Sequence, residues 1–277
     1  MFDDILIAVD GSDCARTAAK YGVELAAKYD AAVDVVTVYG GDAEAGQAVL
    51  DDVAELADGA GVTAETGLLS GKPAKTIVKR ADERGADLIV VGRRGRSGVR
   101  ARLLGTVTER VLRRSPVPVL TVPEGDVASD TGTAYGNVLV TTDGSDLAAE
   151  AGPYGADLAR RFGAALQVLN VVDIQAEAGV FDAGGVGSEY IERLETRGHQ
   201  AVDELVAAVD ASDLDVRRAV IRGAAYDAIG EYVEENGVDV VVMSSEGQSN
   251  LAGQQLGTVA GRVLRTVDDP VLIVTEG

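Results

Sequence analysis

An internal repeat is the feature that most constrains how this chain can fold. The segment ILIAVDGSDCARTAAKYGVELAAKY, which begins at Ile5, aligns with VLVTTDGSDLAAEAGPYGADLARRF, which begins at Val138. In this alignment Asp143 stands 133 positions after Asp10. Farther along, GKPAKTIVKRADERGADLIVVG aligns with GAAYDAIGEYVEENGVDVVVMS at an offset of 152. Self-similarity over such lengths indicates two copies of one structural unit within the 277 residues.

Within each copy, short β-branched runs alternate with amphipathic stretches, which is typical of βαβ units on a parallel sheet. The first copy predicts strands near 4–10, 33–39, 63–69, 87–92 and 118–122 and helices near 13–29, 43–59, 73–84 and 104–114. The second copy predicts strands near 137–142, 165–171, 214–221, 238–243 and 270–274. We therefore expect an α/β fold of two tandem, doubly wound, five-stranded parallel sheets, with ligands beyond the carboxyl ends of the strands.

The repeat also suggests where the domains divide. We expect a first domain over 1–124, a linker rich in small and polar residues over 125–135, and a second domain over 136–277. The second copy is 19 residues longer, and the excess falls in the glycine-rich segment 174–190. A lid or partner-binding loop is one reading, but a surface excursion is the commoner behaviour of such loops. The helix that follows should present one apolar face: Tyr190, Leu194, Val202, Leu205 and Val209.

Composition removes several classes of function. Cys14 and His199 are the only residues of their types, which opposes a disulfide, a zinc site or a Ser/His triad. The net charge of −20 opposes a nucleic-acid or anionic-membrane surface, and its lysine-poor acidity is similar to that of proteins from salt-loving organisms. No apolar run is long enough to span a bilayer, and the first residues lack signal-peptide features. A cytoplasmic location is expected.

One basic segment stands against this acidity. VGRRGRSGVRARLLGT, from Val91 to Thr106, contains four glycines and five arginines. It follows a predicted buried strand and precedes a helix that we expect to begin with a capping box between Thr106 and Glu109. Glycines allow close backbone approach, arginine forks match phosphate oxygens, and a helix N-terminus favours an anion. The segment therefore predicts a small phosphorylated ligand.

The same segment carries a family resemblance. Gly92, Gly95 and Gly105-Thr106 fit the pattern G-x2-G-x9-G-[S/T], which resembles the nucleotide motif of the universal stress protein family. The AVDGS, GKPAKTI and SPVPVLTV segments are similar to that family as well, and the resemblance extends over both copies. The chain thus resembles a tandem universal stress protein.

The resemblance implies an ATP site in the first copy, with or without Mg²⁺. In ATP-binding members of the family, the end of the first strand contacts the nucleoside, a residue of the second strand contacts adenine, and the glycine loop surrounds the phosphates. Carried over by position, these contacts fall on Ala8, Val9, Asp10, Val38, Gly92, Arg94, Gly95, Gly105, Thr106, Val107 and Thr108. Asp10 has an alternative role, because Asp-Gly-Ser also favours a turn into a helix.

The second copy departs from the motif. Ser244 replaces the first glycine and Glu246 replaces Arg94, so a carboxylate stands where phosphates would be expected. Residues 1–130 carry 16 basic and 21 acidic residues, whereas 131–277 carry 9 and 24. We expect weak or no nucleotide binding there, at Asp143, Gly247, Gly257 and Thr258.

A structural role would explain why the second copy persists. Family members commonly dimerise through their last strands, and edge strands such as VPVLTV and PVLIV expose unpaired backbone groups. A tandem chain could satisfy both edges internally as a pseudo-dimer, with further homodimerisation and unidentified protein partners left open.

Three classes of function remain. The first is an ATP-binding stress-response module whose nucleotide state alters association with partners. The second is a slow ATPase or a nucleotidyl- or phosphoryl-transferring enzyme; the sequence lacks a P-loop lysine, and we assign no catalytic residues and no metal ligands. The third is a nucleotide-free interaction protein. Cys14 is expected to be packed, and His199, Arg100 and Arg102 to lie on the surface.

Overall fold

The computed structural model describes residues 1–94, 104–125, 135–174, 188–247 and 256–275. The chain divides into two compact units. The first unit comprises Met1–Ala134 and Asp268–Gly277, and the second unit comprises Tyr135–Val267. The last strand of the second sequence copy therefore belongs to the first unit.

The first unit is built on a sheet in the order β3-β2-β1-β4-β5-β10. The first five strands are parallel to their neighbours, with β1 in the centre between β2 and β4. Ile, Leu and Val residues of β1 and β4 are almost fully buried, as expected for central parallel strands covered on both faces. The strand bounds are β1 Asp4–Ala8, β2 Ala32–Tyr39, β3 Ala64–Ser70, β4 Leu88–Gly92, β5 Val119–Val122 and β10 Val271–Val274.

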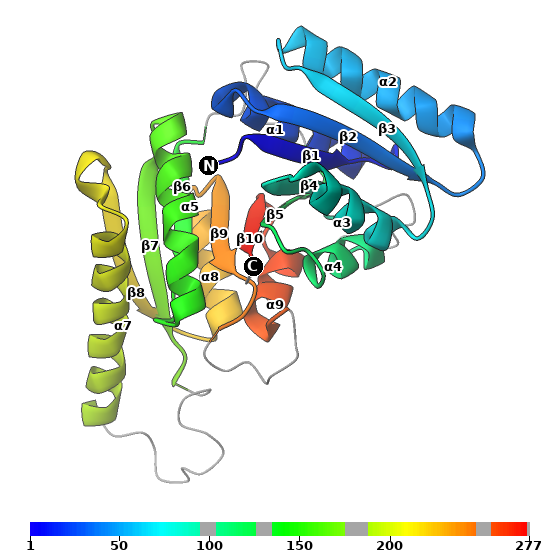
Figure 1. The fold of residues 1–277 in the computed structure, drawn as a ribbon. Helices are drawn as coiled ribbons and strands as arrows, with labels where there is room; N and C mark the ends of the chain where they lie inside the picture. The colour runs from blue at the N-terminus through cyan, green and yellow to red at the C-terminus, as the bar shows by residue number, and fades with distance from the viewer. Residues whose placement is uncertain (95–103, 126–134, 175–187, 248–255, 276–277) are drawn as a thin grey trace. The chain divides into compact units, whose positions relative to one another are not determined.

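Helices cover the two faces of this sheet as the doubly wound topology requires (Figure 1). Helices α1 and α2 pack side by side on one face, and α3 and α4 pack together on the other. Because the chain moves outward from β1 to β3 and then returns to β4, right-handed crossovers place the two pairs on opposite faces. The bounds are α1 Asp13–Tyr29, α2 Ala43–Gly59, α3 Pro73–Arg84 and α4 Thr106–Leu112.

Strand β10 closes the edge of the first unit. It pairs antiparallel with β5, with Leu272 opposite Leu120 and Val271 opposite Thr121. The Thr121 hydroxyl also donates a hydrogen bond of 3.2 Å to the carbonyl oxygen of Val271. The expected pairing of the two copies' last strands inside one chain is confirmed, and it leaves the edge of β5 satisfied.

The second unit repeats the same arrangement over the sheet order β9-β6-β7-β8. Strand β6 is parallel to β9 and β7, strand β7 is parallel to β8, and β6 pairs with β7 in the register of β1 and β2 shifted by 133 residues. Helices α5 and α7 pack together, as do α8 and α9. The bounds are β6 Asn137–Thr141, α5 Asp146–Phe162, β7 Ala165–Val172, α7 Ser188–Ala208, the 3₁₀ turn Ala211–Asp213, β8 Val216–Arg222, α8 Ala225–Asn236, β9 Val240–Ser244 and α9 Thr258–Thr266.

The segment that makes the second copy longer ends in helix α7. Residues 175–187 lie outside the described residues. The apolar face predicted for the following helix is confirmed at Leu194, Val202 and Leu205, which are buried. Tyr190 is only half-buried and lies against the Arg193 guanidinium, whose carbon is 5.3 Å from the ring centre. The buried face thus begins at Leu194, nearly two turns after the start of α7 at Ser188.

Candidate functional site

A cavity of about 310 Å³ lies at the carboxyl ends of β1, β2 and β4 in the first unit. Such a position is where open parallel sheets bind ligands. Ten of the eleven residues expected at a nucleotide site line it; the eleventh, Gly95, lies outside the described residues. The lining is Ala8, Val9, Asp10, Ala15, Val36, Val38, Pro73, Ile77, Val91, Gly92, Arg94, Gly105, Thr106, Val107 and Thr108.

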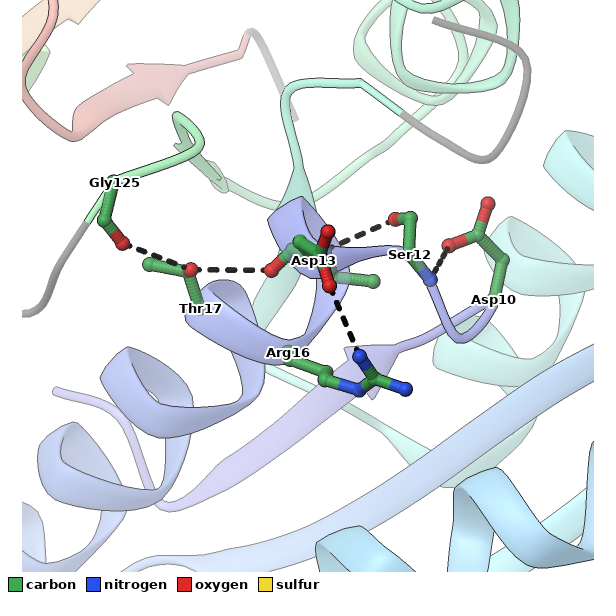
Figure 2. Close-up of polar contacts among 7 residues, drawn as sticks. Asp10, Ser12, Asp13, Arg16, Thr17 and Gly125 are labelled. Carbon is green, nitrogen blue, oxygen red and sulfur yellow. Dashed lines mark hydrogen bonds and ion pairs between the residues drawn. The ribbon is translucent and has the colours of Figure 1, made fainter.

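The turn after β1 fixes Asp10 at the mouth of the cavity. Gly11 adopts a positive φ of 79°, a conformation that glycine adopts without a Cβ penalty. The Ser12 amide then donates a hydrogen bond of 3.0 Å to Asp10 Oδ1, and the Ser12 hydroxyl accepts one of 3.1 Å from the Ala15 amide (Figure 2). The turn-forming role of Asp10 is therefore present in the structure, on a carboxylate that also lines the cavity.

Thr37, on the neighbouring strand β2, holds this turn by a hydrogen bond. Its buried hydroxyl donates a hydrogen bond of 2.7 Å to the carbonyl oxygen of Val9, the residue before Asp10. Asn170 does the same in the second unit, donating to the Thr142 carbonyl over 2.8 Å. Sequence reasoning missed both residues; the signal was a polar side chain at the same repeat position near the end of two mostly apolar strands.

Gly92 lines the cavity, and its missing side chain also has a role in packing. A Cβ built on Gly92 would lie 3.0 Å from the Ala15 nitrogen and from the Cys14 carbonyl carbon. The missing side chain thus admits the first turn of α1 against the end of β4, and close packing of strand and helix explains the glycine. Gly105 closes the loop instead: its amide donates to the Arg93 carbonyl oxygen over 2.9 Å.

The predicted capping box at Thr106 is wrong. Helix α4 does begin at Thr106, but Gly105 is the N-cap residue and no side chain caps the helix. Glu109 instead pairs with Arg113, one turn farther along α4, over 2.9 Å, and both residues are half-buried. The Thr108 hydroxyl donates a hydrogen bond of 2.8 Å to the Gly92 carbonyl. This bond holds the start of α4 against the end of β4.

Two arginines of the basic segment fall within the described residues, and they have different roles. Arg94 is half-buried and lines the cavity. Arg93 is 5% exposed, does not line the cavity, and donates from Nη2 to the Asp269 carbonyl oxygen over 2.6 Å. Burial lowers the pKa of Arg93 to about 10. Its guanidinium therefore fastens the loop to the segment before β10.

Cys14 contacts the backbone of Arg94, at the start of the segment that follows β4. Its thiol donates to the Val122 carbonyl oxygen over 3.2 Å, and its sulfur accepts a hydrogen bond of 3.3 Å from the Arg94 amide. Burial raises the pKa of the thiol, against the opposing effect of the Arg94 and Arg93 backbone hydrogen bonds. Cys14 is packed, as expected, although sequence distance concealed the nearby arginines.

The second unit holds a cavity of about 250 Å³ at the equivalent place. Each of the fifteen residues that line the first cavity has its repeat counterpart in the lining of the second. Asp143, Gly247, Gly257 and Thr258, the four expected residues, are among them. The lining is Thr141, Thr142, Asp143, Ala148, Leu169, Val171, Ala225, Ile229, Met243, Ser244, Ser245, Glu246, Gly247, Gly257, Thr258, Val259 and Ala260.

The charges of the two cavities differ. Asp10 and Arg94 are the ionisable side chains in the described lining of the first cavity, so it carries one charge of each sign. Asp143 and Glu246 are their counterparts in the second, and both are acidic. An anion therefore meets a balanced pair in the first cavity and two like charges in the second.

The described part of the chain offers neither a metal cluster nor a membrane span. No group of three or more histidine, cysteine, aspartate or glutamate side chains within these residues could hold a metal ion. Among the helices of those same ranges, none combines the length and the apolar character needed to cross a membrane.

Comparisons with known proteins agree with the repeat. The model of the universal stress protein family matches residues 1–123 and again residues 134–275. Universal stress protein MJ0531 of Methanocaldococcus jannaschii is 37% identical over 140 residues, which cover 44% of this chain and 82% of that protein. Universal stress protein YxiE of Bacillus subtilis is 34% identical over 148 residues, covering 44% of this chain and 99% of its own.

Solved structures share the full-length fold. A universal stress protein of Archaeoglobus fulgidus matches 100% of both chains with a TM-score of 0.74 and 23% identity. A functionally unknown protein of Pseudomonas aeruginosa, PA1789, matches 99% of this chain and 93% of its own with the same TM-score and 19% identity. At these identities the likeness concerns the fold. Because the family model matches both copies, this chain belongs to the universal stress protein family, as a tandem, two-copy member.

Proposed function

We propose that the first unit binds ATP and that the protein acts as a nucleotide-dependent regulatory module of the stress response. The observation that supports this most is the convergence of ten expected residues, from four separate stretches of sequence, on one cavity. Convergent polar groups in a largely apolar cavity at the end of a parallel sheet are typical of a small-molecule site.

The chemistry of the lining suits a nucleotide. Val36, Val38 and Ile77 offer an apolar surface for a flat base, and the Asp10 carboxylate can accept hydrogen bonds from ribose hydroxyls. On the β4 side, Arg94 supplies a guanidinium that can bind phosphate oxygens in bidentate fashion. The adenine and Mg²⁺ preferences come from the family resemblance alone.

A binding role fits the lining better than catalysis. Asp10 is the one carboxylate among the described lining residues of the first cavity, so those residues offer no second carboxylate to hold a metal or to orient water. We expect ATP to be bound and, at most, slowly hydrolysed. A nucleotide-dependent change in partner binding, in the cytoplasm, would then be the output.

Calorimetric titration of ATP with Mg²⁺ into wild type, Arg94→Glu and Arg110→Glu tests the proposal. Arg110 is exposed on α4 outside the cavity, so its variant makes the same change in net charge elsewhere. We expect Arg94→Glu to weaken binding roughly 100-fold, because a charge-assisted contact becomes a repulsion. Arg110→Glu should bind as wild type does. Equal weakening by both variants, or no binding to wild type, would count against the proposal.

Phosphate release measured on the same samples separates binding from catalysis. The binding role predicts release close to that of a protein-free control. Robust release that disappears in Asp10→Ala would favour the enzyme instead.

A further inference from the structure

We propose that the cavity of the second unit binds an uncharged nucleoside and excludes its phosphorylated forms. The proposal rests on the proposed function insofar as adenosine is taken as the probe. It goes beyond that function because it gives the second copy a ligand of its own class.

The two cavities share one backbone frame. The Asp143 turn has the same construction as the Asp10 turn: the Ser145 amide donates to Asp143 Oδ1 over 3.0 Å, and Gly144 has a φ of 79°. On the opposite wall, the Gly257 amide donates to the Ser245 carbonyl oxygen over 2.6 Å, as Gly105 does to Arg93. The cavity therefore keeps the shape of a ligand site although its motif has changed.

The second cavity retains the apolar surface of the first. Leu169 and Val171 occupy the places of Val36 and Val38, and Ile229 occupies the place of Ile77. Met243 replaces Val91 and adds an adaptable thioether side chain. A flat, apolar-faced ring could therefore pack in this cavity as in the first. The two cavities differ instead on the side where Glu246 replaces Arg94.

The charges of the second cavity disfavour a phosphorylated ligand. The two ionisable side chains of the described lining, Asp143 and Glu246, are both acidic. A Cβ at Gly247 would lie 2.5 Å from Asp143 Oδ2, so this carboxylate packs against the backbone of the loop that follows β9. A triphosphate would bring several negative charges beside two carboxylates in a half-enclosed space, where like charges repel strongly.

The second cavity has neutral polar side chains at positions where the first cavity has apolar residues or glycine. Thr141 and Thr142 stand where the first cavity has Ala8 and Val9, and Ser244 stands in place of Gly92. The Ser244 hydroxyl donates to the Glu246 carbonyl oxygen over 2.6 Å, and Thr142 Oγ1 accepts from the Gly144 amide over 3.1 Å. These hydroxyls and the Asp143 carboxylate match sugar hydroxyls, which are neutral donors and acceptors. The apolar surface, the hydroxyls and the two carboxylates of the lining together suit a nucleoside without phosphates.

The test is a titration of adenosine into the full chain that is already saturated with ATP. ATP occupies the first cavity, so adenosine should bind with a stoichiometry near one per chain. Ala225→Phe, which fills the second cavity at the position equivalent to Pro73, should abolish this binding. Its thermal unfolding should be compared with that of wild type to exclude a folding defect.

Glu246→Arg provides the reciprocal variant. It restores the charge that Arg94 has in the first unit, so we expect a second equivalent of ATP to bind, with affinity raised roughly 10–100-fold over wild type at that cavity. A matched Glu231→Arg variant, on the exposed side of α8 and outside the cavity, should not gain ATP.

Three outcomes would overturn the inference: ATP binding equally to both units of wild type, no adenosine binding that is sensitive to Ala225→Phe, or binding of Mg²⁺ alone that Glu246→Gln removes. If ATP fails to bind wild type at all, adenosine is titrated without it. Loss of binding in Ala225→Phe then supports the second site even though the proposed function of the first has failed.

Discussion

The Thr37 hydroxyl donates a hydrogen bond of 2.7 Å to the carbonyl oxygen of Val9, and this bond holds the end of β1 where Asp10 enters the cavity. The second unit keeps the same bond with a different side chain, from Asn170 to the carbonyl of Thr142. Two chemically distinct residues thus satisfy one buried carbonyl at the same repeat position. The position of the turn after the first strand, rather than one particular side chain, is what both units preserve.

Thr37→Val should therefore weaken ATP binding, although residue 37 does not line the cavity. The valine keeps the shape of threonine but leaves the Val9 carbonyl without this donor, which costs about 1–3 kcal/mol of folding free energy. We expect a several-fold rise in the dissociation constant for ATP by calorimetry, with Thr37→Ser close to wild type. If Thr37→Val and Thr37→Ser bind ATP equally well, the hydroxyl does not position the turn.

Gly92→Ala and Gly230→Ala should change stability in opposite directions. A Cβ at Gly92 would meet backbone atoms of Cys14 and Ala15 at 3.0 Å, and overpacking of this kind costs about 1–3 kcal/mol. Gly230 lies within α8, and a Cβ added there would meet no atom within 4 Å, so alanine should stabilise by about 0.5–1 kcal/mol. Urea denaturation of the two variants measures both effects. Equal tolerance at position 92 would show that α1 can withdraw from β4.

Cys14 should react slowly with thiol reagents in the folded protein. Burial raises the pKa of its thiol, so less thiolate is present at pH 8 than in the unfolded chain, and the sulfur is covered by the Arg94 loop. Reaction with a disulfide reagent should be on the order of 100-fold slower than in denaturant, because a local opening of about 3 kcal/mol must precede it. Saturating ATP should slow it further, since a ligand that binds the native state raises the free energy of opening. Native and denatured rates that agree would contradict this packing.

A half-buried ion pair in the first unit should contribute more than surface pairs do. Asp34 accepts hydrogen bonds of 2.6 and 3.1 Å from Arg80, and Arg84 lies 3.5 Å away. The second unit has replaced the pair with Gln167 and Tyr232 at the equivalent positions. Arg80→Met leaves the buried Asp34 carboxylate with weaker compensation and should destabilise by about 2–3 kcal/mol.

The double variant Asp34→Gln/Arg80→Tyr copies the second unit and should recover part of that loss, because no charge is left buried. Denaturation of wild type, Asp34→Gln, Arg80→Tyr and the double variant forms the cycle that isolates the pair. Strict additivity of the two substitutions would indicate that the two side chains do not interact.

The sequence was sufficient to predict the elements because each rule acted locally. Helices α1, α2 and α3 have the predicted bounds, since the N-caps Ser12 and Asp42 and the αL glycine Gly85 after α3 can be read from adjacent residues. Strand ends agreed within about two residues, and the repeat aligned the two cavities. Pairing of the last strands followed from the need to cover two apolar edges.

What escaped prediction depends on contacts between residues distant in sequence. The burial of Arg93 follows from an acceptor at Asp269, 176 residues away, and the reason for Gly92 is the approach of α1. The capping box failed because Gly105 already ends the loop in an extended conformation, which leaves Thr106 inside the first turn. The role of Thr37 could not be predicted because its acceptor, the Val9 carbonyl oxygen, is 28 residues away, directly after the neighbouring strand β1.

The number of ATP molecules that bind per full chain, measured by calorimetry, distinguishes one nucleotide site from two. We predict saturable binding near one ATP per chain, weakened roughly 100-fold in Arg94→Glu and unchanged in Arg110→Glu. The reason is that the described lining of the first cavity includes a cationic side chain, whereas that of the second has two carboxylates and no cation. Two equal sites per chain would contradict the assignment of different ligands to the two units. No binding at all would contradict the nucleotide site itself.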